Sequence, residues 1–340
     1  MNSDLDISVL MTTYNRAEIL RETLNCFVQL DRVGIRVEFV IIDNNSSDET
    51  AEVIESFRDK LSLRYLFEPR PGKNIALNKA LREVKLGKLV IFTDDDVRPS
   101  SDWLQAIKSI SSRWTDYSVF GGKVELVWPE GQIPIWISNE YLQVMAYSQH
   151  DYADAELPYA KDSYPFGINF WVRREVFAKG LCFQEMIGPR PDGFFIMGSE
   201  LSFLRELSEH GYQILYSPQA VVGHQVQPEQ LAFSYLRRRA LRHGRSMVYF
   251  QPLWQTELYQ KHPLCWHILW AGAFLRNTLQ LGIYYLAFSS NQRMEKIISK
   301  IVALGYLMES LTRVRKQIPD EKSTTCELAA TTVQKSHITN

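Results

Sequence analysis

The sequence has few cysteines, almost no net charge and no export signal. Its four cysteines, Cys26, Cys182, Cys265 and Cys326, are widely separated and none forms a Cys-x-x-Cys pair, so neither a disulfide framework nor a zinc knuckle is indicated. The formal net charge of −1 argues against general nucleic-acid binding. The acidic N-terminus, Met1–Asp6, does not have the pattern of a signal peptide. We therefore expect a cytoplasmic protein.

The sequence also lacks a convincing membrane span. Its most apolar stretch, Leu264–Phe288, contains His267, Arg276, Asn277 and Gln280, which are too many polar groups for a helix that crosses a bilayer. Amphipathic aromatic and basic residues occur in and after this stretch: Trp266, Trp270, Tyr284, Tyr285, Arg293, Lys296, Lys300, Arg313, Arg315 and Lys316. Two alternatives stay open for this region. Either it lies on an anionic membrane surface at the inner face of the cell membrane, or it packs on the catalytic part or on a second subunit.

The first 110 residues alternate between short apolar runs and helical patterns. The strand-like runs are Ile7–Met11, Val37–Ile42, Leu63–Phe67 and Lys88–Thr93. Between them we predict a helix capped by Asn15, a helix opened by a capping box of Ser46 and Glu49, and a helix over Asn74–Val84. This alternation predicts an α/β fold with a parallel sheet and right-handed crossovers.

The alternation ends after about residue 115. Further strands are predicted at Val119–Val127, Phe166–Val172 and Tyr212–Tyr216, as a mixed extension of the sheet. Trp128–Tyr164 is rich in Pro, Trp and Tyr without a clear period, and is predicted to be a long functional loop. From about Gln230 the chain becomes helical and rich in Arg, and its last residues are polar and predicted to be disordered.

The most informative motif is Asp94-Asp95-Asp96, which directly follows the wholly apolar run Leu89–Thr93. Ligands bind outside the carboxyl ends of such strands in open α/β sheets. Adjacent carboxylates repel one another, so a cation should stabilise them, and Mg²⁺ or Mn²⁺ suits carboxylate oxygen. The alternative is an acidic turn before a helix capped by Asp102 or by Ser100 or Ser101. The buried strand before the motif favours a site.

Polar residues follow other predicted strands as well. Tyr14 offers a face on which a base can stack, and Asp43 can accept a hydrogen bond from a base or a ribose, although turn and cap residues have the same pattern. Lys73 and the helix that follows it could meet a phosphate, or could belong to a solvated loop. Parallel strands end at one edge of a sheet, which favours a shared site.

Three later features have both structural and functional interpretations. Glu200 follows Gly198-Ser199 and could simply occupy the first turn of a helix. A lone histidine such as His224 is more often structural than a ligand, unless a metal site is near. The basic run around helix positions 237–245 could be a solvated face or could clamp a pyrophosphate; its members are Arg237, Arg238, Arg239, Arg242, His243 and Arg245.

The order of these motifs resembles that of the family 2 glycosyltransferases, from about Ile7 to Ser246. The matching segments are Val-Leu-Met-Thr-Thr-Tyr-Asn-Arg at 9–16, Val-Ile-Ile-Asp-Asn-Asn-Ser-Ser-Asp at 40–48, Thr-Asp-Asp-Asp-Val at 93–97, Phe-Gly-Ile-Asn-Phe at 166–170, Gly-Ser-Glu at 198–200 and Gly-His-x-Val-x-Pro-Glu at 223–229. The resemblance implies an α/β fold of the GT-A type, with a Rossmann-like, mostly parallel central sheet, a mixed extension and C-terminal helices.

The resemblance implies a role for individual residues. Thr13, Tyr14 and Asp43 would line the nucleoside pocket, Asp94 would approach the nucleotide, and Asp96 would bind the divalent metal that bridges the diphosphate. The cofactor would be Mn²⁺ or Mg²⁺.

Later residues would surround the donor sugar and the reacting group. Gly167 and Asn169 would lie by the donor sugar, Glu200 would be the catalytic base, and His224 would lie near the metal. The donor would be a nucleotide sugar, with a UDP-sugar favoured, and the acceptor a saccharide or a lipid-linked molecule.

The chain departs from the family pattern at two motifs. It has Gly-Ser-Glu where many members have Gly-Glu-Asp, so a single acid, Glu200, remains. It lacks the Gln-x-x-Arg-Trp motif of processive polysaccharide synthases, which favours transfer of one sugar, with inversion, in the synthesis of a cell-surface polysaccharide, glycolipid or related glycan.

The resemblance divides the chain into three parts. We expect a GT-A catalytic domain at 1–228, with its nucleotide-binding half at about 1–115 and its acceptor and sugar half at about 116–228. A helical region at 229–318 and a disordered tail at 319–340 follow.

Two other functions remain as alternatives. One is a nucleotidyltransferase, although the Thr-Thr-Tyr-Asn-Arg loop lacks the glycines and the lysine typical of that class. The other is an inactive scaffold that binds a nucleotide sugar, which the set of Asp94, Asp96 and Glu200 disfavours.

Overall fold

The computed structural model describes residues 5–190, 195–250, 272, 275 and 290–316. The strands are β1 (Ile7–Thr13), β2 (Val37–Asp43), β3 (Leu63–Phe67), β4 (Leu89–Thr93), β5 (Val97–Pro99), β6 (Val119–Val127), β7 (Leu157–Pro158), β8 (Phe170–Arg173) and β9 (Ile214–Gln225). The helices are α1 (Ala17–Val28), α2 (Thr50–Glu55), α3 (Lys73–Glu83), α4 (Trp103–Arg113), α5 (Glu140–Tyr147), α6 (Ser199–Glu209), α7 (Phe233–Phe250) and α10 (Ser290–Lys316), with the short turns η1 (Ile135–Ser138), η2 (Arg174–Lys179) and η3 (Pro228–Leu231).

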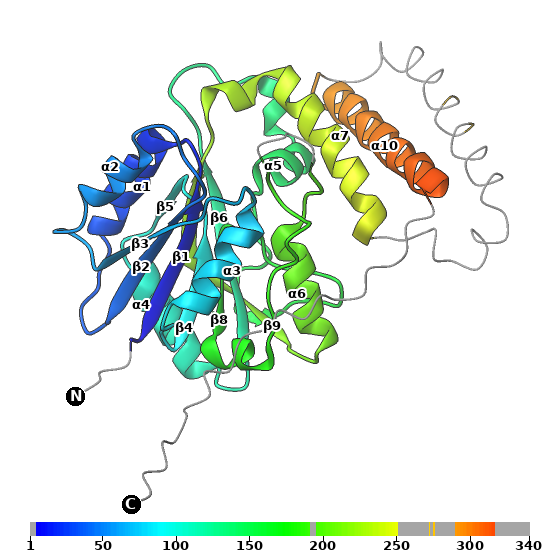
Figure 1. Ribbon diagram of the computed structural model, residues 1–340. Coiled ribbons are helices and arrows are strands. Elements are labelled where there is room, and N and C mark those ends of the chain that lie inside the picture. The colour runs from blue at the N-terminus through cyan, green and yellow to red at the C-terminus, as the bar shows by residue number, and fades with distance from the viewer. Residues whose placement is uncertain (1–4, 191–194, 251–271, 273–274, 276–289, 317–340) are drawn as a thin grey trace, which may run out of the picture.

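Within the described residues nine strands form one mixed sheet, in the order β3-β2-β1-β4-β8-β6-β9-β5, with β7 paired to β9 beside this path (Figure 1). The strands β3, β2, β1 and β4 are mutually parallel, as the alternating pattern predicts. Every residue of β4 is buried. Its carboxyl end therefore delivers the three aspartates to the edge at which β1 and β2 also end.

The mixed extension brings distant residues to the same edge. Strand β8 is antiparallel to both β4 and β6, whereas β9 is parallel to β6. The short strand β5, directly after the aspartates, pairs with the end of β9, with Val97 opposite His224. The sheet is continuous across residue 115, so the two expected halves share one sheet.

Helices cover both faces of the sheet, as Figure 1 shows, and a hydrophobic layer lies beneath them on each face. One layer joins α1 and α4 to the sheet. In it the ring of Phe27 stacks on the rings of both Phe39 and Trp103. The opposite layer joins α3 and α6 and includes a stack of Phe183 on Phe203. Packing in these two layers holds the ends of the strands in place. The residues that directly follow the strands are therefore held in place as well.

Two predicted helix caps are wrong. Asn15 has a left-handed φ of 50°, and the first-turn N–H of Ala17 bonds to the Asp48 carboxylate instead. The capping box of Ser46 and Glu49 does not form, because α2 begins at Thr50. The Ser46 hydroxyl accepts a hydrogen bond from the backbone of Asn15, so it links the ends of two strands.

The expectation of one long loop over Trp128–Tyr164 is also wrong. This segment contains η1, helix α5 and strand β7. Helix α5 forms because the side chain of Asn139 accepts from the N–H of Leu142, and because Leu142 and Tyr147 are buried. Its burial is against α7 and α10, in a third hydrophobic cluster that no local pattern shows.

Helix α10 lies along α7 (Figure 1). A half-buried ion pair joins Arg245 to Glu309 over 2.9 Å. For residues 290–312, packing on the rest of the chain is therefore observed. The stretch Leu264–Phe288, apart from residues 272 and 275, and the tail at 319–340 lie outside the described residues. Across the part of the chain described here, no helix has both the length and the apolar character needed to cross a bilayer.

Glycines allow α7 and α10 to approach closely, which makes Gly244 a test of this packing. A Cβ atom at Gly244 would lie 1.8 Å from the backbone oxygen of Val302. Gly244→Ala should gain at most about 1 kcal/mol of helix propensity. Since backbone must move, we expect a net loss of about 1–3 kcal/mol in unfolding free energy, measured by denaturant titration. Ser234→Ala, at an exposed position of α7, is the control. Equal stability of the two variants would contradict the close packing.

Candidate functional site

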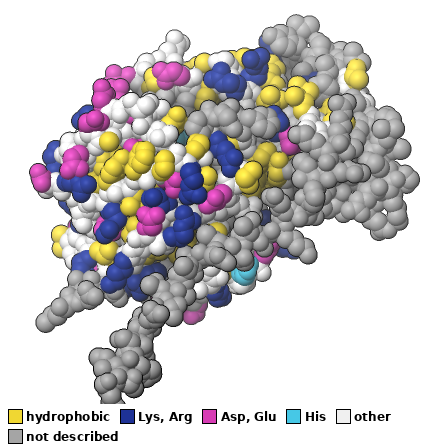
Figure 2. Space-filling model, in the orientation of Figure 1, with side chains coloured by type: hydrophobic (Ala, Val, Ile, Leu, Met, Phe, Trp, Pro, Cys, Tyr) yellow, Lys and Arg dark blue, Asp and Glu magenta, His cyan; other side chains and the backbone are white. Residues whose placement is uncertain are grey.

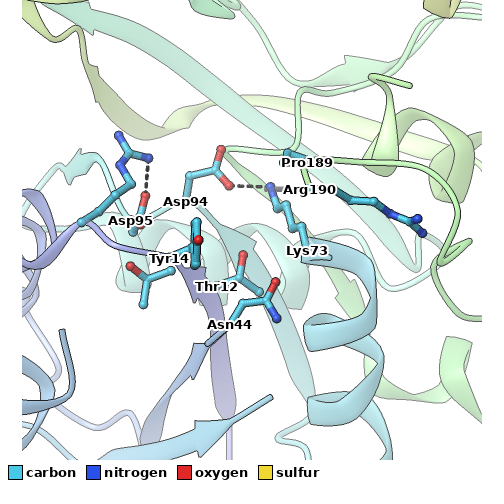
Figure 3. A pocket seen from close by; sticks show the side chains of 10 residues that line it. Thr12, Tyr14, Asn44, Lys73, Asp94, Asp95, Pro189 and Arg190 are labelled. Carbon is cyan, nitrogen blue, oxygen red and sulfur yellow. Dashed lines mark hydrogen bonds and ion pairs between the residues drawn. The ribbon is translucent and has the colours of Figure 1, made fainter. Parts of the chain in front are cut away.

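A pocket of about 320 Å³ opens at the carboxyl edge of the parallel strands, as Figure 3 shows. Its lining residues are Thr12, Thr13, Tyr14, Arg16, Asn44, Lys73, Asp94, Asp95, Pro189 and Arg190. Tyr14 is 40% exposed, so its ring is available for stacking. Charges of both signs are interspersed on the face that Figure 2 shows, in line with the small net charge.

The aspartates after β4 are neutralised in part by Arg16. This residue directly precedes α1, and its two terminal nitrogens donate to Asp95 over 2.6 Å and to Asp96 over 2.7 Å. Burial raises the pKa of Asp95 to about 6, against the opposing attraction of Arg16. The two carboxylates in turn raise the pKa of Arg16, although its burial acts in the other direction.

Lys73 links Asp94, the first of the three aspartates, to the candidate base Glu200. It is the first residue of α3, and its ammonium lies 2.6 Å from Asp94 and 2.5 Å from Glu200. Figure 3 shows Lys73 and Asp94 pointing toward each other. Although burial favours the neutral amine, the two carboxylates outweigh it and raise the pKa of Lys73. The structure thus brings Asp94 and Glu200, 106 positions apart in the sequence, to the same cation.

His224 is a second partner of Asp96, besides Arg16. Its Nδ1 donates to the backbone oxygen of Tyr147 over 2.6 Å, and its Nε2 lies 3.5 Å from Asp96 Oδ2. The desolvation of His224 lowers its pKa, but attraction to Asp96 is stronger, so the pKa is raised. His224 and Arg16 together lower the pKa of Asp96 despite its burial.

The donor set fits a divalent cation. As the side chains of the described residues stand, no three His, Cys, Asp or Glu groups converge closely enough to hold a metal ion. Asp96 Oδ1, however, is buried without a hydrogen-bond partner. In addition, a histidine that gives one ring N–H to a backbone carbonyl is oriented to ligate a metal through the other nitrogen. Carboxylates of Asp94 and Asp96 with His224 Nε2 are ligands that suit Mn²⁺.

Two of the predicted site residues, Asn169 and Asp43, are buried and hydrogen-bonded within the protein. Asn169 is completely buried. Its amide nitrogen donates to the backbone oxygens of Lys123 and Ala220, and its oxygen accepts from Trp103. Both amide hydrogens are used within the protein, so Asn169 ties β6, β9 and α4 together, and its place beside the donor sugar stays a prediction.

Asp43 is likewise 1% exposed and does not line the pocket. Its two oxygens accept from the Ser46 N–H and from the Tyr65 hydroxyl. Its neighbour Asn44 does line the pocket. The Asn44 amide also holds the loop before Lys73, by donating to the backbone of Glu68 and Arg70.

Asn44 belongs to the polar group that follows the second predicted strand, and it lines the pocket. Sequence reasoning assigned no role to Arg16 or Arg190, although Arg16 stands inside the motif at 9–16, directly after a strand. Arg190 had no such signal, because it reaches the pocket from a segment far along the chain.

The comparison with protein families agrees with this geometry. The model described as "Glycosyl transferase family 2" matches residues 8–180, just over half of the chain. The chain belongs to the family 2 glycosyltransferases. It is therefore a transferase of sugars, as the order of the motifs predicts.

Individual relatives of this glycosyltransferase are distant. Glycosyltransferase AglE of Haloferax volcanii is 23% identical over 244 residues, which are 71% of this chain and 73% of that protein. The poly(ribitol-phosphate) beta-N-acetylglucosaminyltransferase TarS of Staphylococcus aureus is 32% identical over 94 residues, which are 27% of this chain and 16% of that protein.

Solved structures confirm the GT-A type fold. A mannosyltransferase from Pyrobaculum calidifontis, solved with GDP-Man and Mn²⁺, matches with a TM-score of 0.56 and 19% identity, over 94% of this chain and 89% of that one. GalNAc-T7, solved with UDP, GalNAc and Mn²⁺, matches with a TM-score of 0.50 and 16% identity, over 71% and 48% of the two chains. At these identities the likeness shows the fold alone.

Gly167 gives a direct test of the position of Glu200 in this glycosyltransferase. A Cβ atom at Gly167 would lie 2.3 Å from both Cγ and Cδ of Glu200, and the backbone there is not left-handed. Gly167→Ala should therefore displace the carboxylate, lower sugar transfer at least about tenfold and leave binding of the nucleotide unchanged. The measurement is turnover beside nucleotide affinity.

A double-variant cycle provides the control for Gly167→Ala. Because the new methyl group collides with Glu200, Gly167→Ala should also lower the melting temperature. In a Glu200→Ala background the colliding atoms are absent, so this loss should largely disappear. An equal loss in both backgrounds would place the strain somewhere other than at Glu200.

Proposed function

We propose that this enzyme transfers one sugar from a nucleotide diphosphate sugar to an acceptor hydroxyl, with inversion at the anomeric carbon. The observation that carries the proposal is the shared cation Lys73. It holds the candidate base Glu200 directly beside Asp94, at the mouth of a pocket with an exposed Tyr14 ring. A nucleoside on Tyr14 would extend its diphosphate toward the aspartates.

Each residue then has a chemical role. A divalent cation held by Asp94, Asp96 and His224 would supply charge stabilisation for the departing nucleoside diphosphate. Arg16 and Lys73 are cations on either side of the aspartates, and Arg190 lines the same pocket. Glu200 would take the proton from the acceptor hydroxyl, which attacks the anomeric carbon from the opposite face. One such displacement inverts the configuration.

Similar proteins support the choice of donor. The two structurally similar enzymes above were solved with GDP-Man or UDP, each with Mn²⁺. We favour a UDP-sugar for this chain, and a saccharide or lipid-linked acceptor in the synthesis of a cell-surface polysaccharide, glycolipid or related glycan. A screen of nucleotide sugars with Mn²⁺ or Mg²⁺, read as release of nucleoside diphosphate, tests the proposal. Donor binding without turnover would favour an inactive scaffold, and release of pyrophosphate a nucleotidyltransferase.

We also propose that the enzyme acts in the cytoplasm, at the inner face of the cell membrane. Helix α10 exposes Leu304, Met308 and Leu311, at a spacing that places them on one face. Basic residues on the same helix, such as Arg293, Lys296 and Lys300, could meet anionic lipid. The vesicle experiment of the next subsection tests this proposal too, since absence of binding to every vesicle would contradict it.

Asp96→Asn tests the metal assignment. The variant loses the anionic ligand, so Mn²⁺ affinity, measured by calorimetry without donor, should fall at least about tenfold and transfer should be abolished. Asp94→Asn keeps hydrogen bonding toward the nucleotide and should be milder. Asp102→Asn, at an exposed position outside the pocket, is the charge-matched control. Full activity in excess chelator, or normal metal binding by Asp96→Asn, would refute the assignment.

Glu200→Gln tests the catalytic base. It keeps the size of the side chain but removes the basic oxygen, so turnover should fall by about 10²–10⁴-fold. If Glu200 only interacts with the helix terminus, the change should cost no more than about 1 kcal/mol of stability and leave turnover nearly intact. Donor affinity, melting temperature and turnover are measured side by side, with the exposed Glu209→Gln on the same helix as control. Near-normal transfer would move the role to Glu206 or to Asp192, which lies outside the described residues.

A further inference from the structure

Helix α7 carries a compact group of basic side chains that the proposed reaction leaves unused. We call Arg238, Arg239, Arg242 and His243 the α7 basic cluster. Residues three and four positions apart share one face of a helix, so these four side chains lie over successive turns. Arg238 is exposed and Arg239 half-buried.

The charges of the cluster act on one another. Burial and the nearby charges of Arg239 and Arg238 lower the pKa of Arg242. Burial and Arg239 likewise lower the pKa of His243. Among the described residues no carboxylate forms an ion pair with Arg238 or Arg239, in contrast to Arg245, which is paired with Glu309. Placing like charges together costs free energy, which an anion bound there would offset.

The cluster contacts two segments of the chain. One is helix α5, which holds His224, and the other is the segment before helix α6, which carries Glu200. On one side, Arg239 donates to the backbone oxygen of Met145 over 3.3 Å. Two residues further, the carbonyl of Tyr147 holds His224, which faces Asp96. The cluster is thus connected to the metal ligands through α5.

The other side of the cluster leads to the candidate base. The guanidinium carbon of Arg242 lies 4.2 Å from the ring centre of Phe195. One turn further along α7, Ser246 accepts from the N–H of Met197, two residues before the start of α6. Glu200 stands in the first turn of that helix. Helix α7 is therefore joined, through Phe195 and Met197, to the segment that leads into the helix carrying Glu200.

An anion at the α7 basic cluster is not the diphosphate of the donor. No residue of α7 lines the pocket, which has its own cations in Arg16, Lys73 and Arg190. The second substrate must approach Glu200 from a direction that the donor leaves open.

We propose that the α7 basic cluster binds a phosphate group of the acceptor, so that the acceptor is a phosphate-bearing molecule. This inference rests on the proposed function, since it requires a hydroxyl acceptor at Glu200. Arg guanidinium groups hold phosphate oxygens in paired, charge-assisted hydrogen bonds, and the planar fork sets the direction of the bound group. A phosphate held at α7 would fix the distance from that group to the hydroxyl that reacts.

The test measures binding of phosphate probes to the full chain, with the donor pocket first saturated with nucleoside diphosphate and Mn²⁺. Glycerol phosphate is the soluble probe. Phosphatidylcholine vesicles with and without dodecyl phosphate are the lipid probe. The variants are Arg238→Gln with Arg239→Gln in one protein, and Arg237→Gln, which removes one exposed charge from the adjacent position of the helix. Melting temperature confirms that each variant folds.

The inference predicts roughly tenfold or greater loss of probe affinity in the double variant and little change in Arg237→Gln. The probe that binds wild type identifies the source of the phosphate as soluble or lipid-borne. Equal loss in Arg237→Gln would indicate a diffuse positive surface and overturn the inference, as would unchanged affinity in the double variant or no binding of either probe by wild type.

Donor turnover separates this inference from the proposed function. Release of nucleoside diphosphate with water as acceptor should be unchanged in the double variant. If wild type binds a phosphate probe through the cluster but releases no nucleoside diphosphate from any nucleotide sugar, the proposed function fails while the phosphate site stands.

Discussion

The site depends on one electrostatic constraint, the concentration of carboxylates at the end of β4. Asp95 and Asp96 are 3% and 5% exposed, and Asp94 and Glu200 lie within reach of one ammonium. Two unit charges about 4 Å apart interact by about 4 kcal/mol at an effective dielectric constant of about 20, so this many adjacent anions could not remain ionised alone. Arg16 and Lys73 supply the compensating charges. Removing one partner of such a buried pair typically costs about 3–5 kcal/mol, which makes both cations structural as well as chemical residues.

The fold delivers these charges through strand ends and helix starts. Arg16 precedes α1, Lys73 opens α3, and Glu200 stands in the first turn of α6. Each position is held by backbone whose neighbours are buried in the two layers on the sheet. The glycine at 167 shows how closely this has been fitted, because any larger side chain there would occupy the space of Glu200.

Much of this arrangement could be predicted from the sequence, because the signals are local. The apolar runs at Val37–Ile42 and Leu63–Phe67 gave strands with nearly the observed bounds, and the aspartates after Leu89–Thr93 marked the functional edge. The helix caps failed because Asn15, Ser46 and Asp48 bond across the ends of two strands rather than along one helix. A local capping pattern cannot distinguish these two uses of the same side chains.

Residues whose roles depend on distant partners could not be assigned in this way. Asn169 looked like a ligand residue, yet its amide joins segments up to 66 positions away in the sequence. Helix α5 was missed because its stability comes from α7 and α10, which lie about a hundred residues or more further along the chain. Such long-range contacts depend on the order of the strands in the sheet. The sequence does not specify that order in the mixed part of the sheet.

The two cations at the aspartates also constrain how the site can work. Arg16 and Lys73 already neutralise Asp96 Oδ2 and Asp94 Oδ1, whereas Asp96 Oδ1 is left without a hydrogen-bond partner, so a divalent ion would share these carboxylates with the two cations. A cation held by Asp94 would compete with Lys73 for that carboxylate, because the Lys73 ammonium lies 2.6 Å from it. Glu200 shares that ammonium, so a single side chain, Lys73, joins an aspartate that lines the pocket to the candidate base.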